Sequence, residues 1–361
     1  MPCIKMASNE NPFGPCPRAV EAMRAAADQV NLYPDDDAGT LRLKLARRFA
    51  VKPEQVLVSA GSTELINDLA RIQLGPGLNA ITSRLSFIIY SSAVQAGGGR
   101  LIEVPMRDDG FDLDAIAAAI DQHTRLIYLA NPNNPTGTMF DAAALDRFLD
   151  RVPANAIVAL DEAYCDFATH FAAARGVTYS RALDYVRAGQ QNLVLLRTFS
   201  KAHGLAGLRI GYGFGTPELM ARLGRARATF SVSSVAQAAA LAALDDEAHV
   251  RRALENNAAG AEFLTRAMAE TGYRAAPTWA NFIYVNLGQE AAPLAARLEA
   301  EGVVIRPLGL WGAPNAIRVT IGTPEQNEFF VGAFRKVMRV PSSATRILPT
   351  TQFLVPDSTE D

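Results

Sequence analysis

Asn134, Asp161 and Lys201 each follow a short apolar run of the kind that forms a buried strand. They supply an amide, a carboxylate and an amine, and a purely structural sheet has no need for that combination, because burying an unpaired carboxylate or ammonium is costly. Parallel strands bring their carboxyl ends to one edge of a sheet, where such sheets bind ligands. We therefore predict that these side chains form one polar site. The apolar runs cover residues 126–130, 156–160 and 193–196.

Lys201 is the most informative of these residues, because it alone among five lysines directly follows a predicted buried strand. A partly desolvated lysine has a depressed pKa and can attack a carbonyl carbon to form a Schiff base. Ser200 and Arg209 flank it with a hydroxyl and a guanidinium, which are groups expected around a phosphate. Taken by its position alone, Lys201 is equally well explained as an exposed loop lysine at the start of a helix.

Asp161 points to the cofactor that this lysine would serve. Pyridoxal phosphate needs a lysine for its aldehyde, an acid for its pyridinium nitrogen and donors for its phosphate. Asp161 can hold the ring nitrogen protonated, while Asn134 and Tyr164 can bond the phenolic oxygen. Taken alone, Asp161 is better explained as a helix N-cap. The cofactor is favoured because several separate segments require the same ligand.

The segment Gly61-Ser62-Thr63 offers the phosphate donors. It stands at the predicted start of a helix after a first strand, where backbone N–H groups face outward and bind anions. We therefore place the cofactor phosphate at Ser62 and Thr63, together with Ser200 and Arg209.

The elements around these residues indicate α/β architecture with a mostly parallel sheet covered by helices. Short strands without polar alternation are separated by helix-length segments, as expected of strands buried on both faces. Beyond residue 235, an Ala-rich helical stretch (235–270) leads to separated strands, which indicates a smaller α+β domain. We predict a large cofactor-binding domain at 35–235, a small domain from 1–34 and 236–340, and a mobile tail at 341–361. Further strands are predicted at 56–58, 80–81, 282–285, 302–306 and 317–320, and a helix at 141–151.

Composition excludes several classes of protein. The 361 residues carry 35 Lys and Arg against 37 Asp and Glu, a net charge of −2, so no basic excess is available for nucleic acid. No apolar stretch approaches the roughly 20 residues of a membrane span, and the N-terminus lacks the apolar core of a secretory signal. Three cysteines suit neither a disulfide framework nor a zinc site. A cytoplasmic protein of about two domains is expected.

Other enzyme classes lack their motifs. A nicotinamide dehydrogenase needs Gly-x-Gly-x-x-Gly, and the glycines of 211–215 are misspaced for it. The four histidines are scattered, so we predict no metal site, and no Gly-x-Ser-x-Gly motif of a serine hydrolase occurs. A non-enzymatic binding protein on the same scaffold remains an alternative, although the intact lysine, acid and amide favour an enzyme.

The chain resembles the fold-type I pyridoxal-phosphate aminotransferases, and within them the histidinol-phosphate aminotransferase branch. The likeness runs in order from about residue 4 to about residue 337. The matching strings are ASNENPFGP (7–15), YP (33–34), PNNPTG (132–137), DEAY (161–164), RTFSK (197–201), AGLRIG (206–211), ANFI (280–283), IRPL (305–308) and IRVTIGT (317–323).

The resemblance implies a role for each matching residue. Lys201 would carry the cofactor and act as general base and acid, Asp161 would pair with the pyridinium nitrogen, and Asn134 and Tyr164 would bond the phenolic oxygen. Phe87 matches the aromatic residue that stacks on the cofactor ring. The phosphate would be held by Ser62, Thr63, Ser200 and Arg209, and by Tyr33 of a partner subunit, which implies a homodimer. The residues implied in substrate binding are Arg318, Arg306 and Asn9.

The resemblance implies transfer of an amino group between an amine and a 2-oxo acid, with glutamate and 2-oxoglutarate as one pair. Histidinol phosphate is the favoured second amino-group partner, which would place the enzyme in histidine biosynthesis. The chain opens almost directly at the Asn9-Glu10-Asn11 string, so we expect a shorter N-terminal arm over the substrate than the branch usually has. An aromatic or specialised amino acid is therefore an alternative, with Phe13, Phe87 and Tyr90 as pocket residues. A decarboxylase or cyclase on the same scaffold is another.

Overall fold

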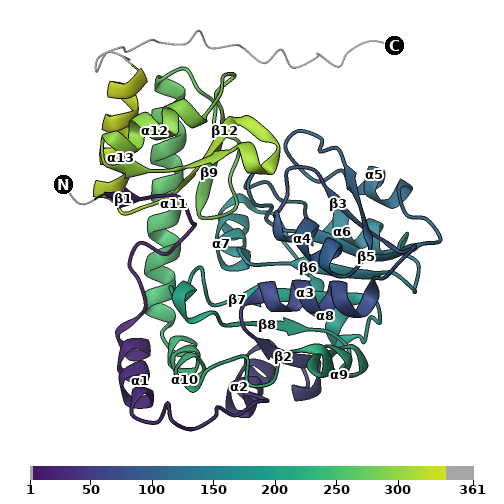
Figure 1. Cartoon of the computed structure of the whole chain (residues 1–361). Coiled ribbons are helices and arrows are strands. Elements are labelled where there is room, and N and C mark those ends of the chain that lie inside the picture. Colours follow the sequence, from purple (N-terminus) through teal and green to yellow (C-terminus); the bar gives the residue numbers. More distant parts are fainter. Residues whose placement is uncertain (1–2, 339–361) are drawn as a thin grey trace, which may run out of the picture.

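The computed structural model describes residues 3–338, and within them seven strands form one central sheet in the order β2-β8-β7-β6-β5-β3-β4 (Figure 1). All pairings are parallel except those of β8, which runs against both of its neighbours. The predicted α/β class with a mostly parallel sheet is confirmed, and the reversed strand β8 was not predicted. The strands are β2 (Val56–Ser59), β3 (Asn79–Ser83), β4 (Arg100–Val104), β5 (Thr124–Ala130), β6 (Ile157–Asp161), β7 (Leu193–Thr198) and β8 (Gly211–Phe214).

The central strands are buried on both faces, which explains their unbroken apolar sequences. In β5, Leu126 and Tyr128 belong to one hydrophobic cluster, while Ile127 and Leu129 belong to another on the opposite face. Successive side chains of a strand point to opposite faces, so a strand covered twice has no polar position.

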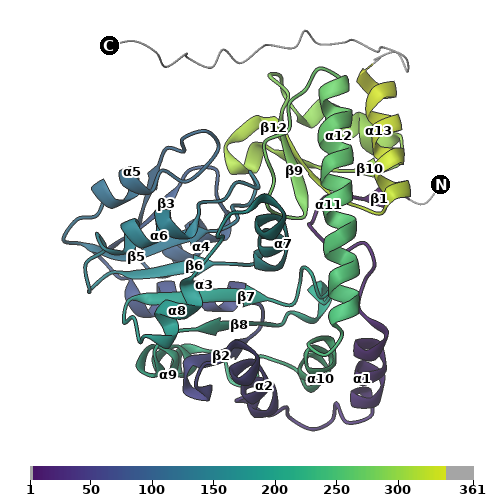
Figure 2. The same cartoon turned by 180° about the vertical axis from the view of Figure 1, so that it is seen from behind.

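Helices cover both faces of this sheet (Figure 2). The face of Leu126 and Tyr128 packs against α3 (Ser62–Gln73), α4 (Ile89–Ala96) and α9 (Pro217–Ala226). The opposite face packs against α2 (Gly39–Phe49), α5 (Leu113–Ala118), α6 (Ala142–Leu149), α8 (Ala182–Arg187) and α10 (Ser234–Ala243). Several helices begin at a capping side chain; Asp141, for example, accepts a hydrogen bond from the Ala144 amide at the start of α6.

A second core lies beside the sheet and is built from a smaller α+β unit. An antiparallel sheet β11-β12-β9 packs with α11, α12 and α13 around a separate hydrophobic cluster. Strand β1 pairs in parallel with β10 at its margin. The elements are β1 (Ile4–Lys5), α11 (Glu247–Glu270), β9 (Phe282–Asn286), α12 (Ala292–Ala300), β10 (Val303–Val304), β11 (Arg306–Leu308), β12 (Ala313–Thr320) and α13 (Pro324–Met338).

The two units are joined by α11 and by the N-terminal segment, which both run between them in Figure 1. The predicted helical stretch 235–270 is two helices, because Asp246 caps a new helix by accepting a hydrogen bond of 3.0 Å from the His249 amide. Helix α1 (Pro17–Ala27) packs with α10 in the hydrophobic cluster of the seven-stranded sheet. The domain boundaries at 34/35 and 235/236 remain a prediction, and the tail predicted at 341–361 lies outside the described residues.

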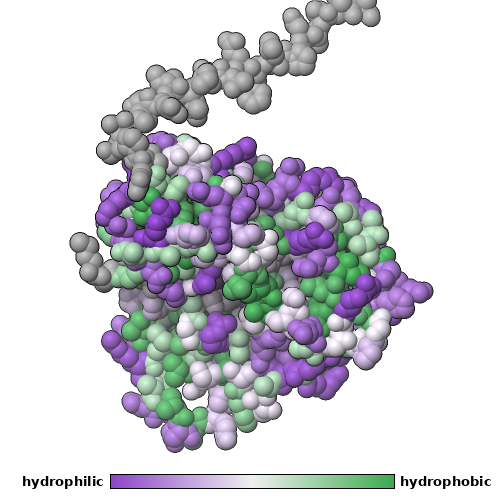
Figure 3. Space-filling model, turned by 45° about the horizontal axis from the view of Figure 1, so that its top comes forward, coloured by the Kyte–Doolittle hydropathy of each residue, from purple (hydrophilic) through white to green (hydrophobic). Residues whose placement is uncertain are grey.

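The described residues contain no helix long and apolar enough to cross a membrane. Hydrophilic and hydrophobic residues are mixed on the face seen in Figure 3.

Candidate active site

A cavity of about 340 Å³ lies where the ends of β5, β6 and β7 meet the small sheet. It brings together twelve of the thirteen predicted site residues, which come from eight separate stretches of the chain. They are Asn9, Ser62, Thr63, Phe87, Asn134, Asp161, Tyr164, Ser200, Lys201, Arg209, Arg306 and Arg318. Parallel strands explain the convergence, because each delivers the residues after its carboxyl end to the same edge.

Lys201 lies in the turn after β7, and its amine has few partners. Its Nζ lies 3.5 Å from the Ser8 carbonyl oxygen and 5.5 Å from the centre of the Tyr164 ring. Burial, together with the nearby Arg318 guanidinium, lowers the pKa of this lysine to about 8. A substantial fraction of the amine is therefore neutral near pH 7 to 8, which is the form that attacks a carbonyl.

Asp161 ends β6 and is almost fully buried without forming an ion pair among residues 3–338. Its carboxylate accepts hydrogen bonds from the Tyr90 hydroxyl at 3.0 Å and from the Ala163 amide at 3.1 Å. Burial raises the pKa of Asp161 to about 6, and these two donors oppose the rise. The residue does not cap a helix, because α7 (Cys165–Arg175) begins beyond it with Tyr164 at the N-cap position.

A cradle for an anion lies at the start of α3. The helix begins at Ser62 after Gly61, so its first N–H groups face the cavity without partners in the helix. The Arg209 Nη1 lies 3.3 Å from the Ser200 hydroxyl oxygen. A Cβ atom at Gly61 would stand 2.7 Å from Arg209 Nη2, and one at Gly211 would stand 2.6 Å from the Ser62 nitrogen. Only glycine permits this close approach at both positions.

Asn134 and Tyr164 lie on the other side of the cavity. The Asn134 side-chain oxygen accepts a hydrogen bond from Arg318 Nη1, which leaves its amide nitrogen available as a donor. The Tyr164 hydroxyl accepts a hydrogen bond of 2.8 Å from Asn9 Nδ2. Asn9 is thus held by an aromatic hydroxyl of the site, and it is buried to 1% exposure.

Arg306 and Arg318 are directly opposite each other on paired strands β11 and β12. Arg318 donates to Asn134 and, at 2.8 Å, to the Ala7 carbonyl oxygen, and its buried Nε has no hydrogen-bond partner within residues 3–338. Among the described residues, neither guanidinium forms an ion pair with a carboxylate. Burial and the neighbouring Arg306 charge lower the pKa of Arg318 to about 10.

The structure also supplies site groups that the sequence did not predict. The carbonyl oxygens of Ala7 and Ser8 contact the arginines and the lysine, and Trp311 lines the cavity beside Arg318, with its ring centre 5.6 Å from the guanidinium carbon. Backbone carbonyls leave no sequence signal. Trp311 could have been found from its sequence, because a tryptophan stands there between glycines in Gly309-Leu310-Trp311-Gly312.

Tyr33, predicted at the cofactor phosphate of a partner subunit, lies outside the cavity of its own chain, and its role stays a prediction. It is 82% exposed and stacks on Phe230 with ring centres 4.6 Å apart. Of the suggested aromatic pocket residues, only Phe87 lines the cavity. Tyr90 is fully buried behind it, and Phe13 lies under the Arg252 guanidinium. The sequence could not predict these ring directions, because they depend on the packing of distant segments.

The cavity fits pyridoxal phosphate by its own chemistry. In the described part of the chain, a nearly free amine, a buried carboxylate that forms no ion pair and an anion cradle converge on one space. Each matches one functional group of that cofactor. No group of three or more potential metal ligands occurs in residues 3–338. The fold and site together define a pyridoxal-phosphate enzyme of the α/β type.

Comparison with known proteins agrees with this class. A model of the family "Aminotransferase class I and II" matches residues 1–334, so the chain belongs to that family. It is a pyridoxal-phosphate-dependent aminotransferase, and the predicted family, activity and cofactor are confirmed.

Individual relatives are similar over almost the whole chain. A histidinol-phosphate aminotransferase of Moorella thermoacetica is 44% identical over 93% of this chain and 85% of its own. A second such enzyme, from Pseudomonas fluorescens, is 45% identical over 93% and 89%. The solved structure of the Sinorhizobium meliloti histidinol-phosphate aminotransferase with pyridoxal-5'-phosphate has a TM-score of 0.87 at 30% identity, covering 93% and 91%. L-threonine-O-3-phosphate decarboxylase of Porphyromonas gingivalis has a TM-score of 0.79 at 25% identity, covering 93% and 99%.

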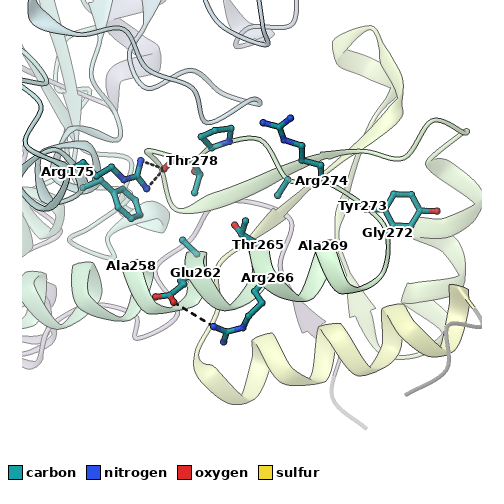
Figure 4. A pocket seen from close by; sticks show the side chains of 14 residues that line it. Arg175, Ala258, Glu262, Thr265, Arg266, Ala269, Gly272, Tyr273, Arg274 and Thr278 are labelled. Carbon is teal, nitrogen blue, oxygen red and sulfur yellow. Dashed lines mark hydrogen bonds and ion pairs between the residues drawn. The ribbon is translucent and has the colours of Figure 1, made fainter. Parts of the chain in front are cut away.

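A larger groove, of about 1000 Å³, lies apart from this site along α11 (Figure 4). Arg175 there donates to the Thr278 carbonyl oxygen, and Glu262 lies 3.6 Å from Arg266 on an exposed face of the helix. The groove contains none of the predicted site residues. Volume alone therefore does not identify the site.

Proposed function

We propose that this aminotransferase acts on histidinol phosphate, with glutamate and 2-oxoglutarate as the other pair, and so serves histidine biosynthesis. The names of the relatives at 44–45% identity support the substrate. The observation that carries the proposal is the pair Arg306 and Arg318. They lie opposite each other, and neither forms an ion pair with a carboxylate of the described residues.

Two arginines in this arrangement repel each other. Like charges directly opposite on neighbouring strands are destabilising, and Arg318 is buried, which adds a desolvation cost. A bound dianion would offset both, because guanidinium groups bind phosphate through paired charge-assisted hydrogen bonds. The carboxylate of glutamate needs only one of them, and Arg318 is the more buried.

We assign the cofactor contacts as the sequence predicted. When bound, pyridoxal phosphate supplies an electron sink for the substrate carbon. Asp161 would hold the ring nitrogen protonated, Asn134 and Tyr164 would bond the phenolic oxygen, and Phe87 would cover the ring. Ser62, Thr63, Ser200 and Arg209 would hold the phosphate. Lys201 would hold the cofactor through its aldehyde, and its lowered pKa suits its Nζ to moving a proton.

We also propose that the working unit is a homodimer. Val30, Leu32 and Tyr33 are 65%, 62% and 82% exposed, and Phe230 is 40% exposed beside Tyr33. Val30, Leu32 and Tyr33 lie together between α1 and α2, and Phe230 stacks on Tyr33. Exposed apolar residues gathered in this way mark interaction surfaces. Tyr33 would then reach the partner subunit's phosphate cradle. A cytoplasmic location accords with the three unpaired cysteines.

Mixing two inactive variants tests the shared site. Lys201→Ala and Tyr33→Ala subunits, unfolded and refolded together, should regain activity, because a hybrid dimer has one site with neither change. Each variant refolded alone is the control. Mixtures no more active than the separate variants, or a fully active monomer in sedimentation, would contradict the dimer proposal.

The substrate is tested by comparing kcat/KM for histidinol phosphate and phenylalanine, with 2-oxoglutarate as acceptor. Arg306→Gln should lower kcat/KM for histidinol phosphate by about 10- to 100-fold, the worth of a hydrogen bond to a charged group, and leave the half-reaction with glutamate nearly unchanged. Arg274→Gln, an arginine of the groove along α11, is the matched control. Undetectable turnover of histidinol phosphate beside rapid use of another amine would reject this substrate and keep the aminotransferase.

A decarboxylase is the second candidate, because a solved decarboxylase of a phosphorylated amino acid shares this fold at 25% identity. The same arginine pair suits that class of substrate. Release of carbon dioxide from threonine phosphate, without conversion of 2-oxoglutarate to glutamate, would favour it over transamination.

A further inference from the structure

Tyr90, in α4, is a titratable side chain that the proposed reaction does not use. It is fully buried behind the cavity, and its hydroxyl donates a 3.0 Å hydrogen bond to Asp161 Oδ2. Burial and the nearby Asp161 carboxylate raise the pKa of Tyr90 well above its usual value. The hydroxyl therefore stays protonated and acts only as the donor.

Two ring contacts hold Tyr90 in place. Its ring stacks on Tyr128 with centres 4.6 Å apart and planes 3° apart, and the Tyr128 hydroxyl donates a 2.6 Å hydrogen bond to the Ile66 carbonyl oxygen in α3. Tyr90 also makes an edge-to-face contact with Phe87. Their ring centres are 5.7 Å apart and their ring planes are at 89°. Tyr90 thus touches both Phe87 and Asp161, and both of these residues line the cavity.

The Asp161 carboxylate depends on this contact because, within residues 3–338, it has only one other hydrogen-bond donor, the Ala163 amide. A buried carboxylate favours its neutral form unless donors or cations stabilise the charge. A neutral Asp161 would offer the ring nitrogen no negative charge. Oδ1 accepts its hydrogen bond from the Ala163 amide and Oδ2 accepts its own from Tyr90, so these two donors fix the orientation of the carboxylate at the cavity.

We propose that Tyr90 is a positioning residue for the cofactor: its hydroxyl keeps Asp161 ionised and directed at the ring nitrogen, while its ring supports Phe87. The proposal rests on the assignment of Asp161 to the ring nitrogen, and it does not depend on which amine is the substrate. It predicts that Tyr90 acts on cofactor binding before any chemistry takes place.

The test measures binding of pyridoxine 5'-phosphate, which lacks the aldehyde and so cannot bond to Lys201. Affinity for the apoenzyme is followed by titration from pH 5 to pH 8. Binding should weaken as the pH falls through about 6, where free Asp161 takes up a proton. The ligand's own titration is common to all variants and cancels in their comparison.

Tyr90→Phe removes only the hydroxyl. It should weaken binding at pH 7 by roughly tenfold, the low end for a hydrogen bond to a charged group. The loss of affinity at low pH, here called the acid limb, should move upward by about one pH unit. Tyr128→Phe is the matched control, because it removes the stacked neighbour's hydroxyl, which bonds to a backbone carbonyl and not to Asp161. It should leave the acid limb in place, although both variants lower the melting temperature.

Asp161→Asn separates the two levels of the proposal. If it leaves the acid limb unchanged, the assignment of Asp161 to the ring nitrogen fails, and with it the role of Tyr90. If it abolishes the limb while Tyr90→Phe matches the unmodified protein, only the role of Tyr90 fails. In the double variant, Tyr90→Phe should add no further loss to Asp161→Asn; independent, additive losses would overturn the coupling.

Discussion

Asp161 and Glu162 are neighbours in the chain and both are buried, yet their surroundings differ. Glu162 Oε2 accepts two hydrogen bonds from the Arg197 guanidinium, at 3.0 and 2.7 Å, and its Oε1 accepts one of 2.7 Å from the Ser180 hydroxyl. Asp161 has two neutral donors and no cation within bonding distance in the described residues. One carboxylate is neutralised by the protein itself, and the other is not.

The difference separates structural charges from ligand-binding charges. A buried pair such as Glu162–Arg197 contributes little net stability but is costly to break. Asp161, Lys201 and Arg318 carry desolvation costs without such compensation, which is why each has a shifted pKa. Unpaired buried charges of both signs around one cavity indicate where a ligand completes the protein.

The largest effect is expected from replacing Lys201, the amine among the three charged residues Asp161, Lys201 and Arg318. Lys201→Ala should reduce turnover by about 10⁴-fold, since it removes both the covalent anchor and the proton-transfer group. Borohydride reduction of the unmodified holoenzyme, followed by peptide mapping, should find the pyridoxyl label on Lys201. Lys44→Ala, which removes an exposed partner of Asp245, is the control and should keep both activity and label. A label on another lysine would contradict the site.

Paired substitutions at the neighbouring carboxylates should have opposite effects. Asp161→Asn should lower turnover about a hundredfold or more through lost charge stabilisation and leave the apoprotein as stable as before, since it removes an unpaired buried charge. Glu162→Gln should cost about 3–5 kcal/mol of unfolding free energy, because it leaves the Arg197 guanidinium buried without its partner. Turnover and denaturant unfolding measure the two effects. Near-normal turnover of Asp161→Asn would reduce that residue to a structural role.

The amine of Lys201 should also titrate apart from the other lysines. Its pKa is lowered to about 8, so its neutral, reactive fraction rises with pH through about 8, whereas exposed lysines become reactive only around 10.4. Competitive labelling of the apoenzyme with trace acetic anhydride between pH 6 and 11 gives each midpoint by peptide mapping. A Lys201 midpoint equal to that of Lys52 would show that the amine is not desolvated.

The smallest effect is expected where charges are exposed. Glu262 and Arg266 lie 3.6 Å apart in the groove along α11 and are 79% and 62% exposed. Glu262→Gln should change the unfolding free energy by less than about 0.5 kcal/mol and leave turnover unchanged, because exposed pairs are screened by water and salt. A clear loss of turnover would show that the groove takes part in the reaction.

Much of the site was predictable from local sequence because of the geometry of parallel sheets. The apolar runs before Asn134, Asp161 and Lys201 form β5, β6 and β7, and the predicted phosphate turn at Ser62 begins α3. A short strand buried on both faces has a recognisable composition, and its direction fixes where the next residues lie. The scarcity of lysine made Lys201 stand out.

Tertiary structure alone decided the features that depend on distant partners. These include the reversed direction of β8, the backbone carbonyls of Ala7 and Ser8 at the site, and the burial of Tyr90 against Asp161. Arg306 and Arg318 are twelve positions apart in the sequence, and only the register of β11 on β12 places them face to face. Residue types and strand composition are local properties, whereas a hydrogen bond, a ring orientation or a strand register exists only once remote segments have packed together.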